Sequence, residues 1–220
     1  VCGWFTRWTP KSMPVEWCRV GVESDINPLY SPAEWDGVIL SGSPRDAWND
    51  DPVNVQLGEW ILRCRDAGVP VLGVCYGHQL MARVLGATVA PDPQGLELGN
   101  TPVTLTPAGR MSKLFDKIPD SFDVLSSHSD VVSNLPSGVI HTVAGTFAPI
   151  QGIQDSTQLL HGVQFHPETD PEVLRLIWNP RRELWRPRVR FNLDEVLDNL
   201  QPTPWGQQIL HNFLHHFVQG

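Results

Sequence analysis

The chain has 220 residues, 41% of them hydrophobic and 18% charged, which is typical of a globular protein long enough to bury a full core. Its formal net charge of −8 argues against general affinity for nucleic acid, which requires a basic surface. No apolar run approaches the roughly 18 residues that a membrane span needs, so we expect one globular domain over residues 1–220 and no membrane segment.

Two apolar runs, at residues 35–42 and 69–75, are predicted to be buried strands. The stretch between them, residues 54–68, has the apolar spacing of a helix and stops at Gly68. A strand, a helix and a second strand in this order form a parallel pair. The sequence therefore predicts an α/β fold with a mainly parallel central sheet flanked by helices.

The second half of the chain has a different pattern. Short, turn-bounded segments predict a small antiparallel extension of the sheet, with strands at residues 100–107, 139–146, 148–156 and 159–166. Residues 203–218 predict a closing amphipathic helix. Its apolar stripe consists of Ile209, Leu210, Phe213, Leu214 and Phe217.

Cys75 lies where the second predicted strand gives way to a helix beginning near Tyr76, and Gly73 and Gly77 flank it. Small residues around a strand–turn–helix junction are typical of a nucleophile elbow, in which a tight turn presents the reactive side chain. The positive end of the helix dipole would point at the sulfur and favour the thiolate. A lone cysteine after an apolar run is more often a small core residue, so the interpretation depends on its partners.

His166 and Glu168 are candidate partners. Side chains two residues apart in a strand lie on the same side, so the Glu168 carboxylate could orient the His166 imidazole. A cysteine, a base and a carboxylate that orients the base are the requirements of nucleophilic acyl transfer. Zinc deaminases share the His-x-Glu spacing but need a Pro-Cys-x-x-Cys motif that this chain lacks. We expect ordinary structural or surface roles for His141, His161, His211, His215 and His216.

Acyl transfer also needs hydrogen-bond donors for the oxyanion. The Gly/Ser/Pro turn within residues 38–46 follows the first predicted strand and could direct backbone N–H groups toward the sulfur. It does not match the spacing of a phosphate-binding P-loop.

The cysteines suggest a reducing compartment. Cys2, Cys18, Cys64 and Cys75 are scattered and form no Cys-x-x-Cys pair, so we expect neither a disulfide framework nor a metal site. The first residues show no basic segment leading into an apolar run, as a secretory signal would. A cytoplasmic location is therefore the expectation.

Four segments together carry a family resemblance: LSGSP at 40–44, GVCYGHQ at 73–79, SSHSDVV at 126–132 and GVQFHPE at 162–168. From about residue 35 to the C-terminus the chain resembles the class I (triad-type) glutamine amidotransferases, most closely the amidotransferase domain of GMP synthetase and its free-standing relatives. The resemblance implies a flavodoxin-like α/β fold and no cofactor. It also implies hydrolysis of the side-chain amide of L-glutamine through a γ-glutamyl thioester, with ammonia released for a partner synthetase.

The resemblance implies roles for individual residues. Cys75 would be the nucleophile, His166 the general base and then acid, and Glu168 the residue that orients it. The oxyanion hole would be formed by the backbone N–H groups of Ser43 and Tyr76, in a loop shaped by Gly42. The amino-acid end of glutamine would be held by Gln79 and by the backbone of Ser127, His128, Ser129 and Asp130. Glu97 falls where the family also has a Glu.

The chain departs from the family pattern in three places. Ser43 stands where GMP synthetases usually have Gly, which keeps the N–H but restricts the backbone. The opening residues, VCGWFTRWTP, are a poor version of the apolar strand with which members begin. Residues 170–202, called the insert below, are rich in Arg and Trp and separate the His-x-Glu motif from the last helix.

We favour the insert as a docking surface for an ammonia-using partner, because Arg and Trp dominate protein interfaces. The candidate contacts are Arg181, Arg182, Trp185, Arg186 and Arg188. A solvated cover that packs on the domain, or a site for an anionic substrate or nucleotide, are the alternatives.

Other functions use the same motifs. A stand-alone γ-glutamyl peptidase would need the same Cys, His and Glu but no partner, and the insert could then shape its substrate pocket. A regulatory module without catalysis would normally lack Cys75 or His166, and both are present. Amidotransferases of the anthranilate synthase type more often have Leu where this chain has Tyr76.

Overall fold

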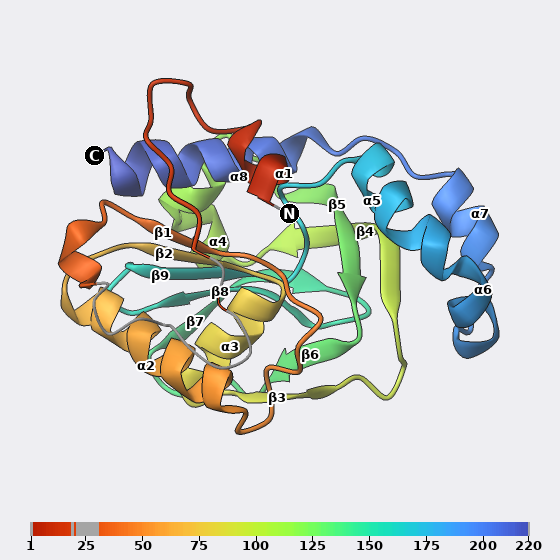
Figure 1. Cartoon of the computed structure of the whole chain (residues 1–220), viewed down its shortest axis with the longest axis horizontal. Helices are drawn as coiled ribbons and strands as arrows, with labels where there is room; N and C mark the ends of the chain where they lie inside the picture. Colours follow the sequence, from red (N-terminus) through yellow and green to blue (C-terminus); the bar gives the residue numbers. More distant parts are fainter. Residues whose placement is uncertain (1, 19, 21–30, 220) are drawn as a thin grey trace.

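The computed structural model describes residues 2–18, 20 and 31–219. A seven-stranded sheet of order β1-β2-β9-β8-β7-β4-β5 has helices on both faces, and β3 and β6 form a separate two-stranded sheet (Figure 1). The strands are β1 (Val38–Leu40), β2 (Val71–Val74), β3 (Thr88–Pro91), β4 (Glu97–Leu105), β5 (Ser121–His128), β6 (Asp130–Ser133), β7 (Val139–Gly145), β8 (Ile150–Asp155) and β9 (Leu160–Val163). The α-helices are α1 (Cys2–Thr6), α2 (Pro52–Asp66), α3 (Tyr76–Val84), α4 (Pro107–Met111), α5 (Pro171–Trp178), α6 (Arg182–Trp185), α7 (Leu193–Asp198) and α8 (Pro204–Phe213). Within the described ranges, no helix has the length and apolarity that a bilayer crossing requires.

The predicted strand–helix–strand unit is present as β1, α2 and β2, and the two strands pair in parallel. Asp51 caps the start of α2 by accepting a hydrogen bond from the Val53 N–H, and Pro52 occupies the first turn, where no N–H is needed. The chain leaves the helix through Gly68, whose φ of +78° is in the left-handed region. Apolar periodicity and the stop at Gly68 therefore predicted this unit, but the helix begins at Pro52, two residues before the predicted start at residue 54.

The fold class is α/β, as predicted, but the sheet is mixed and its antiparallel part is larger than expected. β1, β2 and β9 are parallel neighbours, whereas the four remaining pairs, β9-β8, β8-β7, β7-β4 and β4-β5, are antiparallel. Short connections at 146–149 and 156–159 join β7, β8 and β9, and such connections can only link antiparallel strands. In addition, residues 2–18 form α1 and turns and supply no strand.

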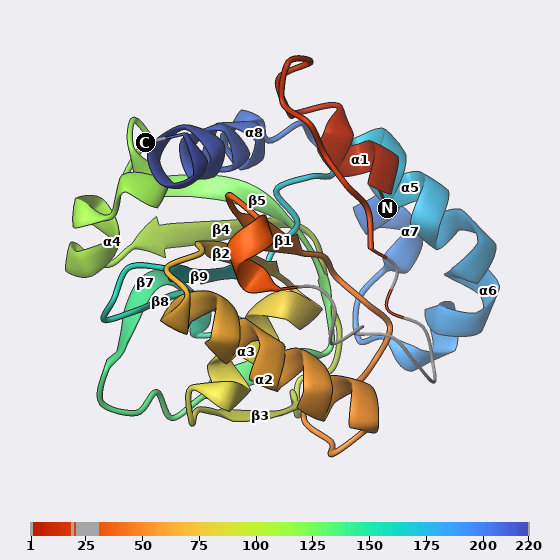
Figure 2. The same ribbon diagram turned by 60° about the vertical axis from the view of Figure 1, so that its left-hand side comes forward.

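Apolar layers hold helices on both faces of the sheet. On one face, Ile209 and Phe213 of α8 are fully buried in a cluster that includes Val74 of β2. On the other face, α2 and α3 contribute Ile61 and Leu80 to a second cluster. Figures 1 and 2 show α8 on the side of the sheet opposite to α2 and α3. The predicted apolar stripe of the closing helix therefore packs on the sheet, and the helix ends in a π-helical turn over Leu214–Val218.

The insert forms α5, α6 and α7, which lie together beside β4 and β5 (Figure 1). Single 3₁₀ turns connect its helices at Asn179–Arg181 and Arg186–Arg188. Its apolar side chains form a third cluster with Leu96, Leu98 and Leu125. The insert is therefore packed against the part of the sheet that precedes residues 127–130.

Two buried histidines make the stability of the fold depend on pH. His78 in α3 and His161 in β9 are at most 1% exposed. Burial lowers the pKa of His78 to about 3 and that of His161 to about 4, from an ordinary value of 6.5. Below pH 6.5 the unfolded chain therefore binds more protons than the folded chain, and the free energy of unfolding falls as the pH falls.

We expect the free energy of unfolding, measured by urea denaturation, to fall between about pH 6.5 and about pH 5 by roughly 1 kcal/mol per pH unit for each of the two histidines. His161→Gln should show a shallower dependence because one of the two groups is gone. His211→Gln, at an exposed position on α8, is the control and should keep the wild-type slope. An unchanged slope in His161→Gln would contradict the assignment.

Candidate active site

Cys75 occupies a strained junction between β2 and α3. Its φ of +52° and ψ of −102° lie in a region that residues with side chains rarely adopt. A Cβ on Gly73 would lie 2.6 Å from the carbonyl carbon of Gly77, and a Cβ on Gly77 would lie 2.5 Å from the carbonyl oxygen of Leu40. The elbow predicted from the sequence therefore forms, and it depends on close backbone packing that leaves no room for side chains.

His166 and Glu168 are in contact, but not for the predicted reason. Nδ1 of His166 lies 2.8 Å from Oε1 of Glu168, whose side chain is 2% exposed. The two residues do not lie in a strand as predicted, because β9 ends at Val163 and both lie in the turn that follows. Hydrogen bonds from the N–H and hydroxyl of Thr169 to the His166 carbonyl, 3.3 and 3.1 Å long, close this turn.

The His166 imidazole connects the carboxylate to the sulfur. Because Nδ1 is held by Glu168, Nε2 is the nitrogen left for the hydrogen bond with Cys75. Burial lowers the pKa of His166, but the charges of Glu168 and Cys75 and the hydrogen bonds to both outweigh burial, so the pKa lies well above its ordinary range. The Glu168 carboxylate and Cys75 therefore favour the imidazolium form of His166.

The loop after β1 packs directly on this pair. A Cβ on Gly42 would lie 2.9 Å from Cε1 of His166 and 3.5 Å from Cβ of Cys75. The Ser43 hydroxyl is used within the loop, where it accepts a hydrogen bond from the Arg45 N–H at 3.2 Å. The loop predicted to hold the oxyanion therefore lies beside the sulfur and the imidazole.

Tyr76 begins α3, where backbone N–H groups have no carbonyl partner within the helix. Its side chain points to α2, where the hydroxyl donates a hydrogen bond to Oδ1 of Asn54 at 2.7 Å. Burial raises the pKa of Tyr76 to about 12, so the phenol stays neutral. The side chain anchors the start of α3, and the predicted contribution of Tyr76 to the site is its N–H.

Residues 127–130, called the 127–130 segment below, lie against Cys75. The carbonyl oxygen of Ser127 is 3.9 Å from Sγ of Cys75. Gln79 supports the segment, because its Nε2 donates to the Asp130 carbonyl at 2.8 Å and to a neighbouring glutamine side chain at 3.3 Å. The amide hydrogens of Gln79 are therefore engaged within the protein, and the residue reaches the site through the segment that it holds.

The His128 side chain is fixed within the protein. Its Nε2 lies 2.7 Å from Oε2 of Glu97, and its Nδ1 lies 3.2 Å from the Asp130 carbonyl. Gln151 donates to the same Glu97 oxygen at 2.8 Å, and all of these side chains except that of Asp130 are buried. Both ring nitrogens of His128 are occupied, whereas His166 has one nitrogen directed to the sulfur. His128 and Glu97 therefore hold the segment in place.

The other two residues of the segment are tied at the backbone. The carbonyl of Ser129 accepts a hydrogen bond from the Asp92 N–H at 2.7 Å. Asp130 begins β6, and burial together with the charge of Asp46 raises the pKa of its carboxyl group. The segment is thus held at several points around the sulfur.

Two segments that contact the site, residues 7–8 and the insert, are not evident as neighbours from the sequence. Trp8 donates from Nε1 to the Glu168 carbonyl at 3.2 Å, and Arg7 forms an ion pair with Asp170. α1 accordingly lies beside α5 in Figure 2. Trp178 of the insert donates from Nε1 to Oγ of Ser127 at 3.0 Å. Each contact joins residues far apart in the chain, so spacing gives no signal of it.

Near the C-terminus, the rings of His211 and His215 stack with centroids 5.9 Å apart, and His215 packs edge-on against His216 at 4.7 Å. In residues 2–18, 20 and 31–219, no group of three or more His, Cys, Asp or Glu side chains is arranged to hold a metal ion.

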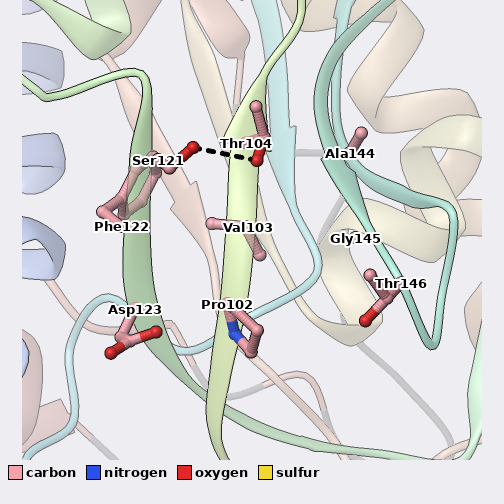
Figure 3. A pocket seen from close by; sticks show the side chains of 9 residues that line it. All are labelled: Pro102, Val103, Thr104, Ser121, Phe122, Asp123, Ala144, Gly145 and Thr146. Carbon is pink, nitrogen blue, oxygen red and sulfur yellow. Dashed lines mark hydrogen bonds between the residues drawn. The ribbon is translucent and has the colours of Figure 1, made fainter.

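A separate pocket of about 490 Å³ lies between β4, β5 and β7 (Figure 3). Pro102 and Asp123, which line it, pair across β4 and β5 several residues from the pair formed by Glu97 and His128. Asp123 is the ionisable side chain in its lining, which includes no histidine or cysteine. The pocket therefore offers no nucleophile–base pair and is distinct from the site around Cys75.

Comparison with known proteins identifies relatives of the chain. The family model described as glutamine amidotransferase class-I matches residues 12–176. The glutamine-hydrolysing GMP synthase of Streptococcus pneumoniae (strain CGSP14) is 34% identical over 178 residues. The alignment covers 79% of this chain and 31% of the relative, so the chain spans less than a third of the length of the curated relatives it matches.

Solved structures share the fold. A glutamine amidotransferase from Thermotoga maritima has a TM-score of 0.71 and 22% identity, over 90% of this chain and 83% of that chain. A glutamine amidotransferase from Methylobacillus flagellatus has a TM-score of 0.72 and 20% identity, over 86% of this chain and 79% of that chain. These structures confirm the α/β architecture.

The close approach at Gly42 gives a test of the site geometry. In Gly42→Ala the new Cβ would stand 2.9 Å from the imidazole, so the loop and His166 must shift relative to one another. We expect alkylation of Cys75 by iodoacetamide, followed by mass spectrometry, to slow on the order of tenfold to a hundredfold, the typical effect of about 1 Å of misplacement. Gly3→Ala is the matched control, because a Cβ at Gly3 meets no atom within 4 Å, and it should react at the wild-type rate. Equal rates for all three proteins would show that this loop does not position the imidazole.

Proposed function

The chain belongs to the class I glutamine amidotransferases, an enzyme family with a Cys-His-Glu triad, and from this we propose that it hydrolyses the side-chain amide of L-glutamine with Cys75, His166 and Glu168. The observation that carries the proposal is the elbow at Cys75. Its thiol interacts with the imidazole of His166, whose Nδ1 lies 2.8 Å from a buried carboxylate. Nucleophilic acyl transfer requires this combination.

In the first half of the reaction, the Cys75 thiolate attacks the side-chain carbonyl carbon of glutamine. The backbone N–H groups of Ser43 and Tyr76 stabilise the oxyanion that forms. The His166 imidazolium then gives its proton to the amide nitrogen, and the C–N bond breaks. Ammonia leaves, and the γ-glutamyl group stays on the sulfur as a thioester.

In the second half, water attacks the thioester carbonyl, and the neutral His166 imidazole accepts a proton from it. The C–S bond breaks, glutamate leaves, and the thiolate–imidazolium pair is restored. Glu168 keeps the ring oriented and stabilises its positive charge in both halves. The raised pKa of His166 suits this cycle, because the imidazolium is the form that protonates the leaving nitrogen.

The amino-acid end of glutamine binds the 127–130 segment in this proposal. The support is that Ser127 touches the nucleophile with its carbonyl group, which places the segment within reach of a substrate attached to the sulfur. The side chains of Gln79 and His128 act indirectly, since both are hydrogen-bonded to the Asp130 carbonyl. They hold the backbone that would contact the substrate.

The ammonia is passed to a synthetase or another amidating enzyme in this proposal. The support is that the matched relatives are named GMP synthases that hydrolyse glutamine, and that this chain corresponds to 31% of their length. The acceptor would be recognised outside the catalytic residues. Of the candidate docking residues in the insert, Arg182 and Arg186 already pair with carboxylates. Arg181 is hydrogen-bonded to the Ile177 carbonyl, and Trp185 packs against Trp178 and Arg188.

We also propose that residues 1–220 form one amidotransferase domain of which the insert is a part. A γ-glutamyl peptidase is the second candidate function, because it would use the same triad. The observation in its favour is the contact of Trp178 with Ser127, which places the insert beside the segment that would hold the glutamyl group. The insert could then contact a residue linked to that group.

The proposal predicts that the isolated chain releases glutamate from L-glutamine and that Cys75→Ala abolishes the release, because the thioester cannot form. Cys64→Ala is the matched control, since Cys64 is a buried cysteine of the core cluster beneath α2. Glutamate can be measured by a coupled assay, with a γ-glutamyl dipeptide as the competing substrate. Preference for the dipeptide would favour the peptidase, and turnover that persists in Cys75→Ala would overturn the assignment of the nucleophile.

The charge of Glu168 predicts a change in the pH profile. Glu168→Gln removes the carboxylate that raises the pKa of His166, so the imidazolium should lose its proton at lower pH. The high-pH limb of the kcat/KM profile for glutamine should therefore move to lower pH by on the order of one unit or more.

Glu97→Gln is the control for this experiment, because it alters the other buried His–Glu pair. It should raise KM through the 127–130 segment and leave the high-pH limb in place. A limb that does not move in Glu168→Gln would contradict the role given to that carboxylate.

A further inference from the structure

The insert reaches the site through one side chain. Nε1 of Trp178, at the end of α5, donates to Oγ of Ser127 at 3.0 Å. The carbonyl oxygen of the same serine lies 3.9 Å from Sγ of Cys75. Ser127 is therefore held by the insert at its side chain and contacts the nucleophile with its backbone.

Trp178 is itself fixed in place. Its side chain is 5% exposed, and its ring packs edge-on against Trp185 with 5.5 Å between the ring centroids. Buried side chains from the insert and from the body of the protein form the surrounding cluster: Leu96, Leu98, Leu125, Leu174, Trp178, Leu193, Leu197 and Leu200. Leu125 and Ser127 both lie in β5. The tryptophan and the serine that it contacts thus share one core.

Polar contacts also hold the insert to the body of the protein. Asn100 in β4 donates to the Gln201 carbonyl at 3.0 Å and accepts from the Gln201 N–H at 2.9 Å. Within the insert, Arg175 of α5 donates to the Leu197 carbonyl of α7 at 2.8 Å. α5 therefore cannot move away from the sheet without breaking hydrogen bonds as well as apolar contacts.

The charges of the insert are balanced within it. Arg182 pairs with Asp194 and Asp198, and Arg186 pairs with Glu183 and Asp194. Residues 170–202 contain six arginines but also six Asp and Glu residues, so the formal charge is zero. A basic docking patch is therefore a weaker explanation of the insert than a role in building the site.

We propose that Trp178 is a positioning residue for glutamine binding: it holds Ser127, and through it the backbone of the 127–130 segment, in the arrangement that binds the amino-acid end of the substrate. This inference rests on the proposed function and extends it to the insert. Gln79 and His128 hold the Asp130 end of the segment. Trp178 holds the opposite end, which is the end next to the nucleophile.

The test is Trp178→Phe, which removes the indole N–H but keeps an aromatic ring in the core cluster. KM for glutamine should rise by roughly two- to tenfold, the effect of one neutral hydrogen bond, with kcat within about twofold of wild type. Trp185→Phe is the matched control, because Trp185 packs against Trp178 without a hydrogen bond to the segment among the described residues. Its KM should stay at the wild-type value.

Ser127→Ala removes the other partner of the bond and completes a double-mutant cycle. The effects of Trp178→Phe and Ser127→Ala on KM should not add, because each variant breaks the same bond. An unchanged KM in Trp178→Phe, or full additivity of the two variants, would overturn the proposal.

Hydrogen exchange separates this inference from the proposed function. Amide exchange in a peptide that covers residues 121–133 should speed up in Trp178→Phe and stay at the wild-type rate in Trp185→Phe. If wild type fails to turn over glutamine, the proposed function fails, and exchange still decides whether Trp178 holds the segment. Equal exchange in the two variants would overturn the positioning role whatever the activity.

Discussion

The positive φ of Cys75 is the constraint on which the rest of the site depends. A residue with a side chain keeps such a conformation, at a cost of about 1–3 kcal/mol, only where its surroundings fix it. Here backbone fixes it: Gly77 packs on the Leu40 carbonyl, and Gly73 packs on Gly77. β1, β2 and α3 are therefore in contact with no side chain between them at this point. The sulfur is presented where these three elements meet, so a shift of any one of them would allow the turn to relax.

The directions of the strands explain why the groups of the site converge. The three parallel strands β1, β2 and β9 run in one direction and end in the loop of Gly42, in Cys75 and in the turn of His166, respectively. The carboxyl ends of parallel strands are where α/β proteins place their sites. The antiparallel part contributes from another direction, since β5 ends in the 127–130 segment. Each group thus comes from a different strand end, and the sheet sets the distances between them.

Local signals made the elbow and the first strand–helix–strand unit predictable. Gly73 and Gly77 mark a turn whose geometry needs them, and the end signals of α2 lie in the sequence itself. The contact of His166 with Glu168 was predicted correctly from a wrong conformation, because a tight turn and a strand can both bring residues two apart together. Trp178 was not predictable as a neighbour of Ser127, because a hydrogen bond between residues so distant in the chain depends on how α5 packs. The arginines of the insert suggested a basic surface. This prediction did not take into account the carboxylates of the same segment, which pair with them.

α5 couples the two halves of the site. The chain passes from Glu168 through Thr169 to Asp170, which caps α5 by accepting a hydrogen bond from the Val173 N–H. Trp178 ends the same eight-residue helix, roughly 12 Å further along its axis. The turn that holds Glu168 therefore leads directly into this helix, and the far end of the helix carries the indole that contacts Ser127. A displacement of α5 would move both the turn of Glu168 and the side chain of Trp178. The insert is therefore linked to the site by direct contacts as well as by its position in the sequence.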